Sequence, residues 1–292
     1  MSDASSQEPE EKTQKTGILL VAYGSASQPG ALSLRGVTAQ ARELFPGLPL
    51  RWAFTSPRMR NRLAQNGKKT DSVYKALCRM TFEGYTHVAV QSLHIIAGFE
   101  YEHLLQEVEQ ARREGGPRAI SVGLPLLGDA SEVELAAKAL VAHLPRERAP
   151  EDAVVCVGHG SGLALRPLPE SALEQGGLEC SAPDGYEALA RAVGNLDANV
   201  FIGALAGEPG VETAIERLRA RHTRRVWLIP LLSVLGKHAE EDLAGQGSRS
   251  WRSRLEQAGF ICKPVLCGAV EYDGLLYIWM RHLERAVREL QE

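Results

Sequence analysis

The stretch VVCVGHGSG, residues 154–162, joins a run of mainly β-branched residues to three alternating glycines. Because β-branched side chains pack well on a pleated surface, such a run is typical of a buried strand. The glycines allow a tight turn that most other residues adopt only with strain. His159 lies between the first two of them. The stretch therefore predicts a strand that presents an imidazole to a cleft at its carboxyl end, or a histidine that is hydrogen-bonded within the turn.

Apolar runs alternate with amphipathic runs on both sides of this stretch. We expect a strand with its following loop at 17–25 and at 153–162, and strands at 50–56, 87–96, 119–127, 199–207, 224–234 and 261–270. We expect helices at 31–45, 57–80, 100–114, 131–144, 185–193, 211–221 and 272–290. Strands that alternate with helices predict parallel sheets with right-handed crossover connections.

The second half of the chain repeats the first. The segment HVAVQSLHIIAGFEYEHL (87–104) aligns with RVWLIPLLSVLGKHAEEDL (225–243), and this alignment places Glu100 on His238. Both residues then follow a strand and a glycine. A repeat of this length indicates two halves built on one plan.

A second pair of segments repeats in the same order. VAYGS (21–25) aligns with VGHGS (157–161), which places Tyr23 on His159. Ligands of open parallel sheets bind at the carboxyl ends of the strands, where such loops gather. Tyr23 is therefore a candidate for contact with the same ligand as His159.

We expect an α/β protein of two similar lobes, each a parallel β-sheet flanked by helices, with an active-site cleft between them. The predicted lobes span 17–150 and 151–292, and the final helix could pack back on the first lobe. They follow a polar, partly acidic segment at 1–16, which we expect to be a disordered tail.

Composition narrows the class of protein. The chain is 44% hydrophobic and 24% charged, which is typical of a globular protein. A net charge of −3 does not favour a nucleic-acid partner. No signal peptide begins the chain and no apolar run is long enough to span a membrane, so we expect no membrane partner. The five cysteines contain no CxxC pair, which favours reduced thiols and a cytoplasmic location.

Two histidines are candidates for a metal site. His159 and His238 both follow strands of the second half, so they should meet at one edge of a sheet. Neutral imidazole is a common ligand of divalent transition metals. Glu100 could be a third ligand or a proton carrier, or simply an acid favoured at a helix start. Glu208 follows a strand directly, as a further candidate ligand or as a polar turn residue.

Other side chains could hold an organic ligand. Arg58, Arg60 and Arg62 gather at a helix start, where guanidinium groups could bind carboxylates or face solvent. Backbone N–H groups near Ser25 could bind an anion. His94 lies within a buried strand, either as a hydrogen-bonded core histidine or as a ligand-binding residue.

The sequence does not contain the common motifs for nucleotide cofactors or for a catalytic serine in a usable context. The glycines of the opening stretch resemble a dinucleotide-binding loop, but two prolines in LALRPLPE (163–170) leave no helix start to hold a pyrophosphate. The sequence contains no GxxxxGK[ST] and no GxSxG motif. We therefore expect no organic cofactor.

Taken together, the motifs resemble those of the anaerobic sirohydrochlorin cobaltochelatases of the CbiK type, a class II chelatase family. The resemblance spans roughly residues 17–290 and rests on segments that occur in the same order. These are VAYGS, WAFTS, GYTHVAVQSLHIIAGFEYE, VVCVGHGSG, VWLIPLLSVLGKHAEEDLAG and SWRSRLEQAGF. The family fold that this implies is two similar α/β lobes with a cleft between them.

The resemblance implies insertion of Co²⁺, as substrate metal, into sirohydrochlorin or its precursor precorrin-2 during anaerobic cobalamin biosynthesis. It places the family's two essential histidines on His159 and His238, and its acid on Glu100. A further family ligand, the glutamate of a V-E-G-Y-P turn, falls on Ala206, so Glu208 would have to replace it. The alternatives are a sirohydrochlorin or porphyrin ferrochelatase that uses Fe²⁺, and a non-catalytic tetrapyrrole or metal carrier.

Insertion requires the metal to lose water, the ring to bend and two pyrrole N–H protons to leave. We expect His159 and His238 to hold the metal, and His159 then to accept a proton, with Glu100 as a relay. The segment 163–184 is longer than the corresponding family loop and rich in glycine and proline. It could cover the cleft or contact another subunit of a homo-oligomer.

Overall fold

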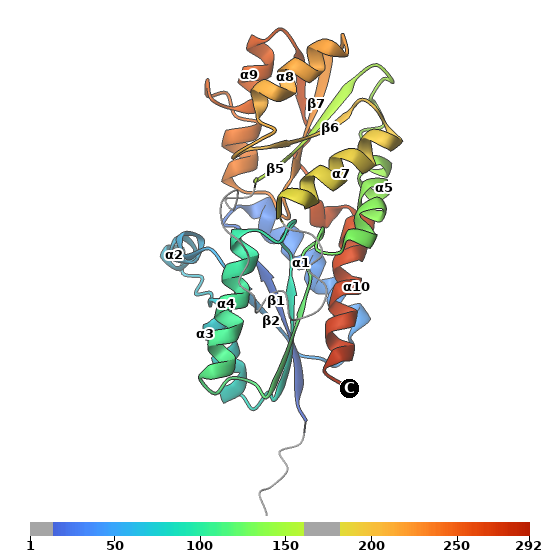
Figure 1. Ribbon diagram of the computed structural model, residues 1–292. Helices are drawn as coiled ribbons and strands as arrows, with labels where there is room; N and C mark the ends of the chain where they lie inside the picture. Colours follow the sequence, from blue (N-terminus) through green and yellow to red (C-terminus); the bar gives the residue numbers. More distant parts are fainter. Residues whose placement is uncertain (1–13, 161–181) are drawn as a thin grey trace, which may run out of the picture.

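The computed structural model describes residues 14–160 and 182–292, which form two lobes stacked end to end (Figure 1). In this part of the chain, each lobe holds a four-stranded sheet in which every strand pairing is parallel. The first sheet, in the order β2-β1-β3-β4, contains β1 (Thr16–Ala22), β2 (Leu50–Phe54), β3 (His87–Ser92) and β4 (Ala119–Gly123). The second sheet, in the order β6-β5-β7-β8, contains β5 (Ala153–Gly158), β6 (Val200–Ala204), β7 (Arg225–Leu231) and β8 (Ile261–Pro264).

The two sheets have the same topology. Each has its first strand next to the centre, pairs it with the second and third strands, and ends with the fourth. All residues of the central strand β5 are buried, as expected for a β-branched run covered on both faces. The prediction of two similar parallel α/β lobes is confirmed.

Helices cover both faces of the sheets (Figure 1). The α-helices of the described chain are α1 (Gln28–Leu44), α2 (Pro57–Gln65), α3 (Val73–Phe82), α4 (Phe99–Arg113), α5 (Val133–Ala142), α7 (Ala182–Leu196), α8 (Val211–Ala220), α9 (Trp251–Gln257) and α10 (Asp273–Glu289). Short 3₁₀ turns lie at η1 (Ala130–Glu132) and η3 (Ala269–Glu271), and a π-helix at η2 (His238–Leu243). None of these helices is long and apolar enough to cross a membrane.

The predicted single helix at 57–80 is wrong, because the chain forms two helices there. Gly67 has a φ of +75°, a left-handed conformation that cannot continue a helix, and α2 has ended by this point. The next helix, α3, begins after Ser72, whose Oγ accepts a hydrogen bond from the Lys75 N–H at 3.4 Å.

Several predicted boundaries also differ from the structure. Strands predicted to end at 96, 127, 207 and 234 end at Ser92 (β3), Gly123 (β4), Ala204 (β6) and Leu231 (β7). The last strand was predicted over 261–270, but β8 ends at Pro264 and the chain then turns into η3, which begins at Ala269. At the other end, the predicted tail 1–16 overlaps β1. Thr16 pairs with His87, so this residue is part of the first sheet.

The last helix of each half packs on the other half. α10 follows the second sheet, yet it packs on β3, β4 and α5, and α5 in turn packs on α7 of the second lobe (Figure 1). The largest buried cluster therefore contains side chains of both lobes, among them Leu20, Leu140, Cys156 and Trp279. Two further clusters lie on the opposite faces of the sheets. The shared core holds the two lobes in a fixed relation.

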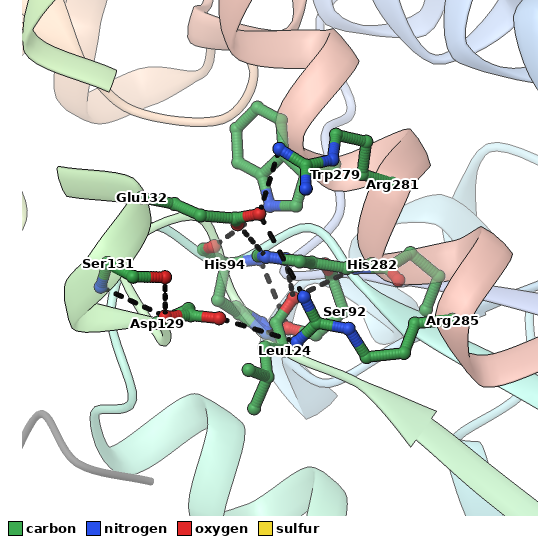
Figure 2. Close-up of polar contacts among 11 residues, drawn as sticks. Ser92, His94, Leu124, Asp129, Ser131, Glu132, Trp279, Arg281, His282 and Arg285 are labelled. Atoms are coloured by element: carbon green, nitrogen blue, oxygen red, sulfur yellow. Dashed lines mark hydrogen bonds and ion pairs between the residues drawn. The ribbon is translucent and has the colours of Figure 1, made fainter. Parts of the chain in front are cut away.

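A polar network fastens α10 to the first lobe (Figure 2). The Glu132 carboxylate contacts His282 Nε2 at 2.6 Å and Arg281 Nη1 at 3.2 Å. His282 Nδ1 lies 3.0 Å from the Leu124 carbonyl oxygen. Glu132 and His282 are both buried, so removal of either would leave a buried polar group of the other without one of its partners.

Candidate active site

A cavity of about 1140 Å³ lies at the carboxyl ends of the strands, between the two lobes. The loops after β1 and β3, helix α2 and the start of α4 line it from the first lobe. The loop after β5, the end of β7 and the start of η2 line it from the second. The fold therefore places the cavity where open parallel sheets usually bind ligands.

The structure brings His159 and His238 together in this cavity. Their ring centroids lie 4.9 Å apart, and the ring planes are nearly perpendicular, at 85°. Since bonds from a divalent metal to imidazole nitrogen are about 2.1 Å long, one ion between the rings could contact both. His159 follows β5, and His238 is the first residue of the π-helix η2.

Asp242 fixes the orientation of His238. Its Oδ2 lies 2.6 Å from His238 Nδ1, four residues earlier on η2. When the Nδ1–H group of the neutral ring donates a hydrogen bond to this carboxylate, the lone pair is on Nε2, the atom suited to bind a metal. Within the described residues, Nε2 has no hydrogen-bond partner.

The glycines beside His159 allow close packing of its loop. Gly160 has a φ of +89°, and a Cβ at this position would collide with the Ala206 carbonyl oxygen. A Cβ on Gly158 would collide with the Tyr186 hydroxyl. The Ala206 N–H also donates a hydrogen bond to the His159 carbonyl oxygen at 3.1 Å. The loop is thus held by backbone contacts that only glycine permits.

Electrostatics favour a neutral His159. Partial burial lowers the pKa of His159, and the neighbouring His238 lowers it further, while Glu100 and Asp242 oppose this shift. The ring is nevertheless accessible from the cavity. A neutral, accessible imidazole can bind a metal ion or accept a proton near neutral pH.

The two candidate acids lie in different surroundings. Glu100 lines the cavity from the first turn of α4 and interacts electrostatically with His159. Glu208 does not line it. The Glu208 carboxylate accepts hydrogen bonds from the Gly210 N–H and the Thr213 hydroxyl, both at 2.8 Å, and these bonds lower its pKa. The predicted role of Glu208 as a metal ligand does not fit this placement.

In residues 14–160 and 182–292, no three His, Cys, Asp or Glu side chains are grouped as a metal site. The predicted trio of His159, His238 and Glu208 is therefore not assembled. The two imidazoles can supply only part of a coordination sphere. Water or the ligand itself must supply the rest, as expected for a site that receives and releases a metal.

Two of three predicted binding residues line the cavity, and the third does not. Tyr23 and Arg58 line the cavity. Ser25 does not, because it is buried and its Oγ donates to the Leu235 carbonyl oxygen at 2.8 Å. This bond joins the first lobe to the second and gives the Ser25 side chain a structural role. Anion binding by backbone N–H groups near Ser25 stays a prediction.

His94 is one of the residues that line the cavity. Its Nδ1 is 2.8 Å from the Ser92 hydroxyl, and its Nε2 is 3.4 Å from the Thr55 hydroxyl. Burial without a charged partner lowers its pKa from the usual 6.5 to about 4. Both ring nitrogens have hydroxyl partners, as expected for a hydrogen-bonded core histidine.

We predict that His94 makes the free energy of unfolding depend on pH. Above pH 6.5 His94 is neutral in both states, but between 6.5 and about 4 only the unfolded chain binds its proton. Stability must therefore fall as the pH decreases through this window, by about 2 kcal/mol between pH 6.5 and 5. Urea unfolding at pH 7 and pH 5 should show that loss diminished in His94→Gln. Equal losses in wild type and variant would contradict the assignment.

Several residues of the site were not predicted. Asp242 lies four residues after His238, and this helical spacing was a usable signal. Tyr186, Asn61 and Gln65 line the cavity, but no sequence pattern marked them. The predicted flap or subunit contact at 163–184 falls almost wholly on residues 161–181, which lie outside the described part of the chain.

Comparison with solved structures defines the fold as that of the chelatases. The sirohydrochlorin chelatase SirB from Bacillus subtilis subspecies spizizenii, in complex with cobalt, superposes with a TM-score of 0.60 at 13% sequence identity. The match covers 95% of this chain and 97% of that one. CbiX, described as the terminal enzyme for siroheme biosynthesis in denitrifying bacteria, gives a TM-score of 0.53 at 16% identity, over 92% of this chain and 99% of that chain.

Sequence comparison then gives the family. The cobalt chelatase (CbiK) family model matches residues 16–167 and 174–288. The sirohydrochlorin cobaltochelatase CbiKC of Nitratidesulfovibrio vulgaris (strain Hildenborough) is 48% identical over 278 residues, covering 95% of this chain and 93% of that protein. The sirohydrochlorin cobaltochelatase of Salmonella typhimurium (strain LT2) is 30% identical over 280 residues, covering 94% and 97%. The chain belongs to the CbiK cobalt chelatase family, and the predicted resemblance is confirmed.

Proposed function

We propose that this protein is a sirohydrochlorin cobaltochelatase, which inserts Co²⁺ into sirohydrochlorin or precorrin-2 during anaerobic cobalamin biosynthesis. The observation that carries the proposal is the pair His159 and His238, 4.9 Å apart in a cavity between the lobes of a CbiK-family protein. A cavity of about 1140 Å³ offers room for a tetrapyrrole. The cobaltochelatase relatives support the choice of ring and metal.

In this proposal His238 receives the substrate metal. Asp242 holds the imidazole by Nδ1 and leaves the Nε2 lone pair for Co²⁺. His159 supplies a second nitrogen from the facing loop. Two neutral nitrogens bind the ion without satisfying all its coordination positions, so the metal can pass to the four nitrogens of the ring.

In the same proposal, His159 removes a proton from the ring. As the metal leaves His159, its imidazole becomes free to accept a pyrrole proton. Its lowered pKa keeps the ring neutral and ready to accept that proton near neutral pH. Glu100 lies within electrostatic range of His159 and lines the same cavity, which suits it to pass the proton to solvent.

Other residues of the cavity wall bind the ring in this proposal. Tyr23, the repeat counterpart of His159, faces the cavity from the first lobe. Arg58 lines the cavity from α2, where a guanidinium can bind a ring carboxylate. A cytoplasmic site of action agrees with the free thiols of Cys78, Cys156, Cys262 and Cys267.

Absorption spectroscopy of metal-free sirohydrochlorin mixed with Co²⁺ and a small amount of protein tests this proposal. We expect the spectrum of the cobalt product to grow far beyond one equivalent of protein, and faster than the uncatalysed reaction. A change that stops at one equivalent would contradict catalysis and indicate a carrier. Turnover with Fe²⁺ but not with Co²⁺ would overturn the choice of metal and indicate a ferrochelatase.

A further inference from the structure

One face of α2 is rich in hydrogen-bond donors and lines the cavity. Arg58, Asn61, Arg62 and Gln65 follow one another at helical spacing, so they lie on the same side of the helix. All of them are exposed and contribute to the cavity wall. The face presents two guanidinium groups and two carboxamides, and we call it the α2 donor face.

Contacts on the other side of α2 fix its rotation. Arg60 points away from the donor face, and its guanidinium donates to the carbonyl oxygens of Phe54 and, at 2.9 Å, Thr55 at the end of β2. Leu63 is the buried residue of the helix. The predicted cluster of Arg58, Arg60 and Arg62 therefore divides, because Arg60 has a structural role while its neighbours face the cavity.

The positive charges of the donor face are not neutralised by the described protein. Helix α2 contains no acidic residue, and neither Arg58 nor Arg62 forms an ion pair within the described residues. Other arginines of the same lobe are paired, as in Arg51 with Glu83 at 2.9 Å. Two unpaired guanidinium groups one helical turn apart, facing a cavity, are suited to carboxylates of a bound molecule.

Acidic side chains of the cavity lie near the histidines. Glu100 and Asp242 interact electrostatically with His159. Glu241 also lines the cavity but is paired with Lys237 at 3.1 Å. The cavity thus contains a region of acids and imidazoles suited to a divalent cation as well as the α2 donor face, which is suited to a polyanion. The two substrates of a metal insertion carry these opposite charges.

We infer that the α2 donor face recognises the acidic side chains of the macrocycle and selects rings with many carboxylates over rings with few. This inference rests on the proposed function. A ring with carboxylates all round its edge can pair both guanidiniums and carboxamides when it displaces their water. A ring with few carboxylates leaves some donors dehydrated and unpaired, and that loss weakens its binding.

Fluorescence quenching of two metal-free rings tests the inference without catalysis. The probes are uroporphyrin, an octacarboxylic ring, and deuteroporphyrin, a dicarboxylic one. We expect R58Q/R62Q to weaken uroporphyrin binding by about tenfold or more, and deuteroporphyrin binding by less than about threefold. Raising the salt concentration should weaken uroporphyrin binding less in the variant than in wild type.

A control variant outside the cavity and a second variant on the donor face complete the design. Arg42→Gln removes an exposed charge from α1, away from the cavity, and should leave both affinities unchanged. Gln65→Glu puts a carboxylate on the donor face at an exposed position, where folding is not at risk, and should weaken uroporphyrin binding. If R58Q/R62Q does not fold, the uroporphyrin affinity of Gln65→Glu tests whether the donor face binds ring carboxylates.

The possible outcomes separate the inference from the proposed function. Unchanged uroporphyrin affinity in R58Q/R62Q and Gln65→Glu would overturn the inference alone. Equal weakening of both rings would also overturn it, because α2 would then shape the cavity without selecting charge. Failure of the wild-type protein to bind either ring would remove the proposed function itself.

Discussion

His159→Ala and His238→Ala are each expected to lower the steady-state rate of Co²⁺ insertion into sirohydrochlorin by about 10²–10⁴-fold, the usual range for loss of a positioned acid–base group. The two rings face each other at 4.9 Å in the cavity, so neither can substitute for the other without leaving its loop. The measurement is the growth of product absorbance at Co²⁺ concentrations below saturation of the wild type, with circular dichroism to show that each variant is folded.

The two variants should differ in how the rate is lost. His238 is held by Asp242 with its Nε2 free, so its removal should chiefly raise the Co²⁺ concentration needed for half-maximal rate. Removal of His159, the proposed base, should chiefly lower the maximal rate and leave a residual rate that rises with pH. The pH dependence therefore separates metal binding from proton transfer.

His87→Ala is the matched control for these histidines. His87 begins β3, at the end of the sheet opposite the cavity, and its Nδ1 lies 2.9 Å from the Thr86 hydroxyl. We expect insertion by this variant to equal that of wild type. Normal turnover in His159→Ala would contradict the catalytic assignment, and the glycine loop would then be only a structural turn.

Gly160→Ala is expected to cost about 3 kcal/mol or more of unfolding free energy and to remove most of the insertion activity. The residue has a φ of +89°, where a side chain is strained, and the new Cβ would overlap the Ala206 carbonyl oxygen. The loop could escape only by moving away from β6, and this movement would carry His159 out of register with His238. Urea unfolding and the insertion assay measure the two effects.

A helical glycine provides the control for this substitution. Gly36 lies within α1, and a Cβ there would meet nothing within 4 Å. Gly36→Ala should therefore leave activity unchanged and raise stability by up to about 1 kcal/mol, because alanine loses less conformational entropy in a helix. A Gly160→Ala protein as stable and active as wild type would show that the loop tolerates a side chain.

The sequence alone determined the repeat and its consequence for the site. The alignments that placed Tyr23 on His159 and Glu100 on His238 predicted two parallel lobes with facing loops, and the structure has that topology. The alternation of strands and helices carries this information, because the residues that follow parallel strands lie together at the carboxyl edge of the sheet. The pairing of His159 with His238 followed from the same rule.

Only the tertiary structure decided which neighbours of these residues reach the cavity. Glu208 lies two residues after Ala206, the position that aligns with the family's ligand. Its carboxylate, however, accepts hydrogen bonds from the Gly210 N–H and the Thr213 hydroxyl at the start of α8. Ser25 is used in a bond between the lobes. Sequence lists the donors and acceptors, whereas the folded backbone determines which of them are already paired.

The same reason separates Arg60 from Arg58 and Arg62. The rotation of α2 against the end of β2 gives Arg60 two carbonyl partners and leaves its neighbours facing the cavity. The sequence suggested that the last helix could pack back on the first lobe but did not decide it, because many apolar faces are interchangeable as partners. The structure places α10 on β3 and β4 of the first sheet. A hydrophobic pattern specifies that a face must be buried, and only packing between elements distant in sequence specifies what buries it.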